Sequence, residues 1–255
     1  MLFADAALAR RIEGAEAAIA RGCARKGAAA LDVAGGCAIF MGAESPLTQA
    51  VGIGLNGPVS EAEIGWIESF FRSRGAKVKL DLCPLADPGL LEALASRGYS
   101  VLEFNNVLAR RLTGAEAESA PRVRRLRDGE GELWSDVVGR GFFETATLSP
   151  EEMDVGRAIV AMPGAMCYLG LDEGQPAGGA AMAVWNGLAM LFGDSALAAS
   201  RRRGLHRELI AARLAEARSQ GCDLAAASTL PGSASQRNYE RMGFEVVYTR
   251  AALTH

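Results

Sequence analysis

A strand–helix–strand unit occurs twice in this chain, and the repeat constrains the fold more than any other feature. In the first half, residues 77–83 alternate apolar and charged side chains, which is the pattern of a half-buried strand. Asp87 and Pro88 then form a typical helix start, Gly98 ends the helix, and a second strand is predicted over 99–108. This order of elements is typical of α/β folds.

The second half repeats the order. An apolar strand over 222–228 is followed by a turn, a helix over 233–242 and a strand from Phe244. Gly243, which ends the second helix, follows Gly98 by 145 residues. We infer a duplicated unit.

Two tandem domains are therefore expected, over 1–118 and 119–255, joined by an Ala- and Glu-rich linker over 113–121. The length of 255 residues allows two modest domains, and 49% hydrophobic with 22% charged residues is typical of a globular chain. A net charge of −3 excludes a protein that coats nucleic acid through bulk charge.

Cysteine and histidine usage excludes several kinds of site. The five cysteines show no C-x-x-C spacing and histidine occurs only at positions 206 and 255, so neither a metal centre nor a nucleophilic triad is predicted. The odd number of cysteines and the lack of an apolar run of about 18 residues favour a cytoplasmic protein with no membrane partner. Residues 1–22 resemble an amphipathic helix and not a secretion signal.

Residues 165–197, ahead of the second unit, are predicted to form three antiparallel strands. Asn186-Gly187 is a strong signal for a tight hairpin. Gly193 lies inside the last strand, where a glycine predicts a bulge, and bulges gather beside active sites. The alternative is a glycine tolerated for packing.

A cationic glycine turn follows these strands and leads into a helix. Residues 201–218 contain six arginines and two glutamates, although the chain as a whole is negative. Arg201, Arg202 and Arg203 precede Gly204 at the expected helix start. Unpaired N–H groups and the helix dipole suit a phosphate or pyrophosphate there. The alternative is a solvated arginine face paired with nearby glutamates.

These residues carry a resemblance to a known family. Arg201-x-x-Gly204-x-His206 resembles the pyrophosphate signature [Q/R]-x-x-G-x-[G/A] of the GNAT superfamily of acyl-CoA-dependent N-acyltransferases. His206 departs from that signature, and we expect its side chain to point away from the phosphates.

A second motif supports the resemblance. Residues 238–244 resemble the later block of the same family, which ends in Tyr-x-x-x-Gly-Phe and here includes Tyr239. The asparagine often found seven or eight residues before that tyrosine is absent, and Ser233 or Ser235 is expected to cover part of its role. The resemblance covers about 121–250, and weakly the first half.

The resemblance implies an α/β (α+β) fold of two tandem GNAT-like domains, each a mixed, mostly antiparallel central sheet flanked by helices. It also implies acetyl-CoA or another short acyl-CoA as co-substrate, with no metal. The implied coenzyme-binding residues are Ala196, Leu197, Ala198, Arg201, Arg202, Arg203, Gly204, Leu205, His206, Ser233, Ser235 and Asn238.

In the resembled family an amine attacks the thioester directly, so no covalent enzyme intermediate is needed. Tyr239 is the candidate general acid for the leaving thiolate. Asp194 is the candidate base, because an amine with a pKa near 10.4 is almost fully protonated at neutral pH. The alternatives are a tyrosine that packs on a helix with its polar tip at the surface, and a surface carboxylate on a strand.

The acceptor side is expected at Phe142, Phe143 and Glu144, which lie between two predicted helices. In the resembled fold this loop borders the acceptor pocket, and an aromatic pair with a carboxylate suits an amine that carries apolar bulk. Helix-end packing is the alternative. We expect a small-molecule amine as partner and no nucleic acid, and a homodimer is compatible with the sequence.

The first half lacks both signatures at the equivalent positions. Ser60 and Glu63 form a capping box where the second half has its arginine-rich turn, and Leu94 replaces Tyr239. The first domain is therefore interpreted as a degenerate copy without a coenzyme site.

Three other functions stay open at this point. One is a non-catalytic acyl-CoA-binding or sensor protein. Another is nucleic-acid binding through Arg201 to Arg203, which predicts steep salt dependence. The last is an aminoacyl-tRNA-dependent transferase built on tandem GNAT-like domains.

Overall fold

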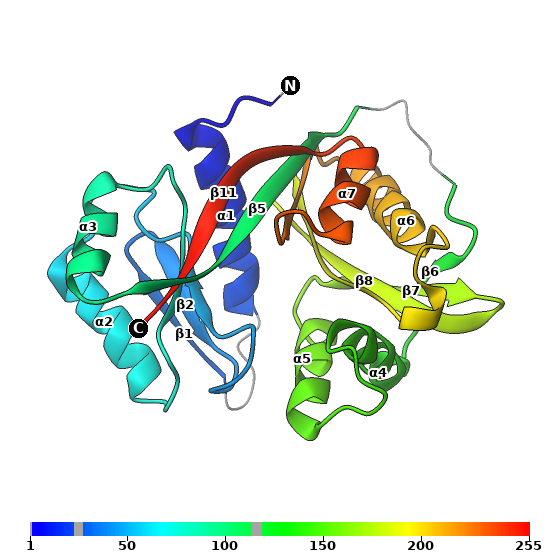
Figure 1. The fold of residues 1–255 in the computed structure, drawn as a ribbon. Helices are drawn as coiled ribbons and strands as arrows, with labels where there is room; N and C mark the ends of the chain where they lie inside the picture. Colours follow the sequence, from blue (N-terminus) through cyan, green and yellow to red (C-terminus); the bar gives the residue numbers. More distant parts are fainter. Residues whose placement is uncertain (1, 23–27, 114–118) are drawn as a thin grey trace. The chain divides into compact units, whose positions relative to one another are not determined.

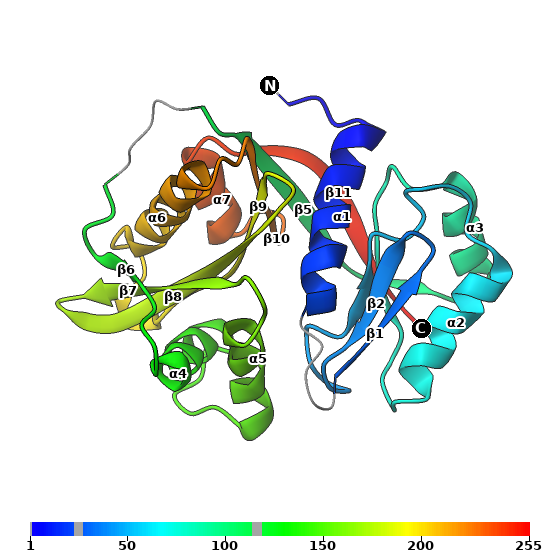
Figure 2. The same ribbon diagram turned by 180° about the vertical axis from the view of Figure 1, so that it is seen from behind.

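The computed structural model describes residues 2–22, 28–113 and 119–255. The chain divides into two compact units (Figures 1 and 2). Unit 1 comprises Met1–Val107, Thr229–Pro231 and Val246–His255, and unit 2 comprises Leu108–Ser228 and Gly232–Glu245. The expected boundary at 118 lies outside the described residues. By its contacts, the C-terminal segment belongs to the unit that the first half builds.

Unit 1 is a sheet with helices on both faces. Its elements are α1 (Ala6–Gly22), β1 (Ala29–Val33), β2 (Gly36–Phe40), β3 (Gln49–Val51), α2 (Glu61–Arg72), β4 (Lys79–Leu82), α3 (Pro88–Ser96), β5 (Ser100–Arg111) and β11 (Glu245–Thr254). The strand order is β1-β2-β3-β4-β11-β5. β3 and β4 run parallel, whereas β1–β2, β2–β3 and β4–β11 are antiparallel.

Alternate residues of β2 explain the two helical layers of unit 1. Cys37 packs with Ala17 of α1, while its neighbour Ala38 belongs to the core formed with α2 and α3. Successive strand side chains point to opposite faces. Both faces of β2 are therefore apolar and covered.

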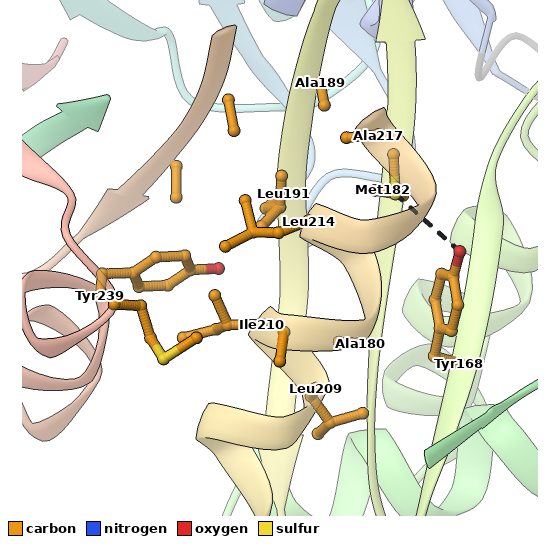
Figure 3. Packing of buried hydrophobic residues seen from close by; sticks show 14 of the residues in the cluster. Tyr168, Ala180, Met182, Ala189, Leu191, Leu209, Ile210, Leu214, Ala217 and Tyr239 are labelled. Carbon is orange, nitrogen blue, oxygen red and sulfur yellow. Dashed lines mark hydrogen bonds between the residues drawn. The ribbon is translucent and has the colours of Figure 1, made fainter. Parts of the chain in front are cut away.

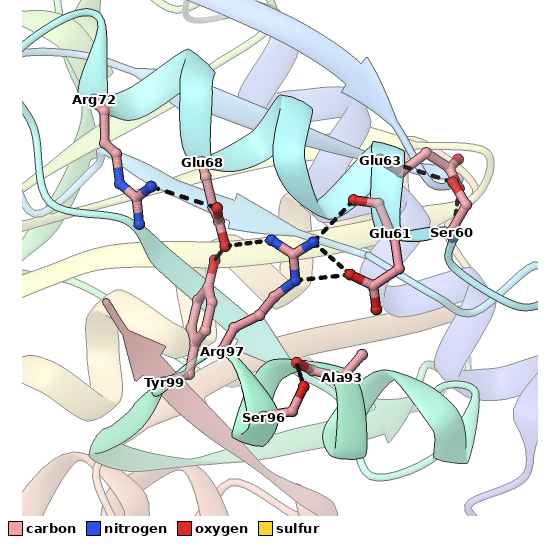
Figure 4. Close-up of polar contacts among 9 residues, drawn as sticks. All are labelled: Ser60, Glu61, Glu63, Glu68, Arg72, Ala93, Ser96, Arg97 and Tyr99. Carbon is pink, nitrogen blue, oxygen red and sulfur yellow. Dashed lines mark hydrogen bonds and ion pairs between the residues drawn. The ribbon is translucent and has the colours of Figure 1, made fainter.

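Two helix starts in unit 1 follow the predicted caps. Ser60 and Glu63 form a complete capping box at α2, and the Asp87 side chain accepts a hydrogen bond from Gly89 at α3. Between these helices, Arg97 donates to the Glu61 side chain and, at 3.0 Å, to Glu68 (Figure 4).

Unit 2 contains the remaining elements. They are β6 (Val123–Arg125), α4 (Gly131–Phe142), α5 (Pro150–Val160), β7 (Met166–Asp172), β8 (Gln175–Trp185), β9 (Leu188–Ala196), the 3₁₀ turn η1 (Ala198–Ser200), α6 (Leu205–Ser219), β10 (Leu224–Thr229) and α7 (Ala234–Arg241). The strand order is β10-β9-β8-β7-β6, antiparallel except for β9 and β10. The predicted fold class, a mixed and mostly antiparallel sheet flanked by helices, is confirmed.

The repeat is visible in the order of elements. α2-β4-α3-β5 in the first half corresponds to α6-β10-α7-β11 in the second. The final strand of each copy reaches the other unit: β5 continues into unit 2 beside β10, and most of β11 lies in unit 1 beside β4.

The core of unit 2 lies on both faces of β8. Ala180 and Met182 belong to the same buried cluster as Ile210 of α6 and Tyr239 of α7 (Figure 3). On the other face, a Cβ at Gly179 would lie 2.8 Å from the Trp134 indole nitrogen of α4. The small residues of β8 thus let α4 approach the sheet closely.

Candidate functional site

β9 contains a bulge at the centre of unit 2. Opposite Ala180, β9 carries two residues, Gly193 and Asp194, because the register shifts there. Gly193 has a φ of +66°, which a residue without a Cβ adopts without strain. The predicted bulge is confirmed, and Asp194 is the residue that follows its glycine.

β9 and β10 are paired over only part of their length. Their parallel register ends at Leu191 and Ala227, whereas β9 continues to Ala196. Over residues 192–196, the edge of β9 that faces away from β8 is therefore not paired with β10. A backbone edge of this kind can pair with the amides of an extended ligand.

The loop after β9 leads into α6, whose N-terminus has no side-chain cap. Arg202 has a φ of +63° and Gly204, the N-cap of α6, a φ of +83°. Gly204 has no side chain to cap the first N–H groups, and no other side chain caps this end of α6 among the described residues. The start of α6 therefore offers N–H groups and a positive dipole end to an anion.

Two of the three loop arginines are paired with carboxylates. Arg201 forms an ion pair with Glu144, and Arg203 pairs with Asp172 and, at 3.2 Å, with Glu173. The expected alternative of a paired arginine face therefore holds for these two side chains. Arg202 is exposed and has no ion pair among the residues that the structure describes.

Arg122 fixes the loop to the rest of unit 2. Its Nη2 donates to the Arg203 carbonyl at 2.8 Å and its Nε to Glu208 Oε1 at 2.9 Å. The backbone N–H of Arg122 also donates to Glu208 at 3.0 Å. These contacts position the first turn of α6.

Asp194, Tyr239 and Arg213 form a closed polar group below this loop. The Tyr239 hydroxyl donates to Asp194 Oδ2, and Arg213 Nη2 forms an ion pair with Oδ1. Tyr239 is 1% exposed and Arg213 0% exposed. The two candidate catalytic residues thus meet, and neither is a surface side chain.

Arg213 was not predicted as a site residue. Its Nη1 donates to the Ala181 carbonyl and its Nε to the Leu209 carbonyl, both at 3.0 Å. Nη2 lies 3.3 Å from the Tyr239 hydroxyl oxygen. One signal was present in the sequence: Arg213 is four residues after Leu209, on the apolar face of the predicted helix.

The charges of this group set its proton affinities. Burial raises the pKa of Asp194, but the Arg213 guanidinium and hydrogen bonds outweigh it, so the net pKa lies below its usual value. Burial also raises the pKa of Tyr239 well above its usual value; Arg213 opposes that rise and Asp194 adds to it. Asp194 is therefore a carboxylate at neutral pH, and Tyr239 a neutral phenol.

His206 adjoins the same group. Its Nε2 lies 3.6 Å from Asp194 Oδ2, and its ring meets the Tyr239 ring edge to face at 5.7 Å. Asn238 Nδ2 lies 3.0 Å from His206 Nδ1. The side chain is therefore directed toward Asp194 and Tyr239.

The other candidate coenzyme residues have their own partners. Ser233 caps α7 by accepting from the Gln236 N–H at 3.1 Å. The Leu197 N–H donates to Ala177 at 2.8 Å, and the Ala196 carbonyl accepts from Arg201 at 3.1 Å. Ala198 opens the turn η1, Leu205 is buried in the core, and Ser235 is half-buried on α7.

The candidate acceptor residues follow α4. Phe142 is exposed and its ring meets that of Phe143 edge to face at 5.1 Å. Glu144 has a φ of +53° and pairs with Arg201. Arg201 Nη2 also donates to the Gly141 carbonyl at 2.8 Å, so one arginine ties the end of α4 to the loop between β9 and α6.

The equivalent positions of the first copy have different chemistry. α2 begins at a side-chain capping box, where α6 has Gly204 and no side-chain cap. Leu94 is buried at the position that corresponds to Tyr239.

No group of three or more potential metal ligands occurs within residues 2–22, 28–113 and 119–255. Likewise, no helix in the described part of the chain is long and apolar enough to span a membrane.

Comparison with known proteins adds to this geometry. Residues 134–244 match the acetyltransferase (GNAT) family. The matched segment contains the bulge of β9, the loop, α6 and Tyr239. No curated protein matches the chain in sequence.

Solved GNAT structures share the fold over most of the chain. A GCN5-related N-acetyltransferase from Kribbella flavida has a TM-score of 0.70 at 19% identity, covering 96% of this chain and 95% of that one. A GCN5-related N-acetyltransferase from Sphaerobacter thermophilus has a TM-score of 0.59 at 15% identity, covering 89% and 75%. A tandem GNAT protein from the clavulanic acid biosynthesis pathway has a TM-score of 0.53 at 14% identity, covering 76% and 68%.

Proposed function

We propose that this protein is an N-acyltransferase that moves an acetyl or short acyl group from acyl-CoA to a primary amine. The observation that carries the proposal is the placement of Tyr239 and Asp194 beside the glycine bulge of β9, below an uncapped helix start. The family match over 134–244 includes all of these residues. The first domain is proposed to be a degenerate copy that binds no coenzyme, and the reducing cytoplasm is the proposed compartment.

The proposed coenzyme contacts follow from the free groups of the loop. The N–H groups around Gly204 and the unpaired Arg202 would hold the pyrophosphate, and the edge of β9 near Ala196 would pair with the pantetheine amides. When bound, acyl-CoA would supply an activated thioester carbonyl. Arg201 and Arg203 would contribute only by exchanging their present carboxylate partners.

Tyr239 is the proposed proton donor to the departing sulfur. Arg213 lies 3.3 Å from its oxygen, so a guanidinium would stabilise the phenolate left behind. Asp194 is proposed to orient the phenol, because a carboxylate held by Arg213 at lowered pKa is a weak proton acceptor. Phe142, Phe143 and Glu144 are proposed to border the amine.

One observation favours a second candidate, a non-catalytic acyl-CoA sensor. The only hydroxyl proton of Tyr239 is donated to Asp194, and it reaches a thiolate only when that hydrogen bond breaks. A sensor would bind acyl-CoA without turnover. An aminoacyl-tRNA-dependent transferase would instead respond to charged tRNA and not to CoA.

Two measurements test the proposal. In a thermal-shift panel, acyl-CoA at 100 times its Kd should stabilise the native protein by about 2.7 kcal/mol. With a panel of primary amines, Tyr239→Phe should lower the rate of acyl transfer by about 100-fold or more and leave acyl-CoA affinity within about twofold.

Tyr168→Phe is the matched control, since Tyr168 is another buried tyrosine of unit 2, whose hydroxyl faces Met182 at 4.0 Å. It should keep both properties. Binding with no turnover of any amine would favour the sensor, and no binding of any acyl-CoA would exclude both functions.

A further inference from the structure

One oxygen atom of Asp194 faces two proton donors. Tyr239 donates its hydroxyl to Oδ2, and His206 Nε2 lies 3.6 Å from the same oxygen. That distance is just beyond a hydrogen bond, so the phenol holds Oδ2 while the imidazole stands beside it. Oδ1 forms the ion pair with Arg213.

The surroundings of His206 suit both of its protonation states. With Nδ1 next to Asn238 Nδ2 at 3.0 Å, the neutral ring accepts at Nδ1 and carries its proton on Nε2. If the ring gains a proton, the Asn238 amide can turn its oxygen to Nδ1, and Nε2 can donate to Asp194. Among the described residues, the ring contacts Asp194, Tyr239 and Asn238, and Arg213 is the charged partner of Asp194.

His206 is also the most open member of the group. Its side chain is 19% exposed, against 12% for Asp194 and 0% for Arg213. The imidazole therefore has the most exposed surface of the three side chains, although its Nε2 atom is itself buried.

We propose that His206 and Tyr239 compete for Asp194 Oδ2, so that protonation of His206 releases the Tyr239 hydroxyl to act as a proton donor. The inference rests on the proposed acyl transfer. As the C–N bond forms, the amine nitrogen loses a proton, which His206 accepts. The imidazolium then donates to Asp194, and the freed Tyr239 hydroxyl protonates the sulfur as the C–S bond breaks.

The protons balance over the cycle. One proton leaves the amine and one reaches the sulfur, and the imidazolium and the phenolate are left as an ion pair across Asp194. Transfer of the extra proton from His206 through Oδ2 to the Tyr239 oxygen restores both neutral groups. Arg213 keeps Asp194 a carboxylate at the start and at the end of the cycle and stabilises the phenolate.

The first test needs no acceptor amine. The chain has two histidines, His206 and His255, so the imidazole resonances of the whole protein can be assigned from the spectrum of His206→Gln. Tyr239→Phe removes the competing donor. It should move the titration midpoint of His206 to higher pH by about 0.5 unit or more, because the carboxylate then interacts more strongly with the imidazolium.

Tyr168→Phe is the control for this titration and should leave the midpoint of His206 unchanged, while His255 serves as the internal reference. An unchanged His206 midpoint in Tyr239→Phe would overturn the proposed competition, whether or not the protein binds acyl-CoA.

The second test uses the pH profile of turnover. His206→Gln should lower kcat by about 100-fold, remove one limb of the profile, and leave KM for acyl-CoA within about twofold. A profile that keeps its shape in His206→Gln would overturn the role of His206. Failure of the wild-type protein to bind any acyl-CoA would instead count against the proposed function and leave the histidine titration interpretable.

Discussion

Arg213 of α6 and Asp194 of β9 form an ion pair inside unit 2, with the arginine side chain fully closed to solvent. The pair joins the main helix of the unit to the bulged strand. Both the stability of unit 2 and the position of the Tyr239 hydroxyl therefore depend on it.

Replacement of Arg213 should therefore destabilise the protein strongly. Arg213→Met leaves the Asp194 charge in a buried site without its partner, and we expect a loss of about 3–5 kcal/mol in the free energy of unfolding of unit 2. Chemical denaturation followed by tryptophan fluorescence would measure it, since Trp134 is buried in that unit.

Two variants control this measurement. Arg157→Met breaks an exposed ion pair with Glu132 and should cost at most about 1 kcal/mol. Combining Arg213→Met with Asp194→Asn should recover part of the loss, because no unpaired charge remains. A cost below about 1 kcal/mol for Arg213→Met alone would contradict the argument.

Gly204 should be replaceable only at a cost. Its φ of +83° strains any residue with a Cβ, so Gly204→Ala should lower stability by about 1–2 kcal/mol and weaken acyl-CoA binding about tenfold. Gly65→Ala in α2 is the control, since a Cβ there meets nothing within 4 Å. It should leave binding unchanged and stabilise α2 by up to about 1 kcal/mol. Calorimetric titration with acyl-CoA compares the two variants. Equal affinities of Gly204→Ala and Gly65→Ala would exclude a close approach of the coenzyme to Gly204.

Glu144 should weaken coenzyme binding through its ion pair with Arg201. Glu144→Gln removes the negative charge beside the Arg201 guanidinium, which keeps its hydrogen bonds to the Ala196 and Gly141 carbonyls. Because exposed ion pairs contribute about 0.2–1 kcal/mol, acyl-CoA affinity should rise roughly two- to fivefold at low salt. The gain should shrink as salt increases. Glu132→Gln, which removes one of the two carboxylate partners of Arg157, should leave affinity unchanged; a similar gain in both variants would indicate a general charge effect.

A buried acidic cluster in unit 1 should make stability depend on pH. Arg250 contacts Glu13 at 3.3 Å and Asp81 at 3.1 Å and pairs with Glu16, while Tyr248 donates to Glu13 at 2.8 Å. Burial raises the pKa of Glu13 to about 7 and that of Asp81 to about 6.

The sign follows from proton binding. Between about pH 4.5 and 7, Glu13 and Asp81 hold protons in the native state that they have released in the unfolded chain. The native state is therefore stabilised at pH values below the unfolded pKa, and this stabilisation is lost as the pH rises through the native pKa values. We expect the free energy of unfolding of unit 1 to fall over this range, by about 1.4 kcal/mol for each unit by which a pKa is raised.

Glu13→Gln should flatten this pH dependence, and Glu92→Gln, at an exposed position of α3, should preserve it. Denaturation curves at a series of pH values measure both. A stability that rises between pH 5 and 7 in the wild-type protein would contradict the assignment.

Local sequence determined the elements and their ends. Ser60 with Glu63, Asp87 before Pro88, and Ser149 with Glu152 cap the predicted helices, because a cap needs only residues within one turn. Asn186 and Gly187 both have positive φ at the predicted hairpin, for the same local reason. The 145-residue repeat likewise predicted the second α-β-α-β order.

The tertiary structure decided which residues from distant elements meet. Arg213 lies on an apolar helix face and was counted only as part of a basic segment, but its partner Asp194 comes from a strand 19 positions earlier. The cluster of Glu13, Asp81 and Arg250 joins three elements spread over the whole chain. Burial and partner choice depend on packing across the sheet, which no local pattern encodes. The same reason explains why β11, predicted in the second domain, lies by its contacts in unit 1 beside β4.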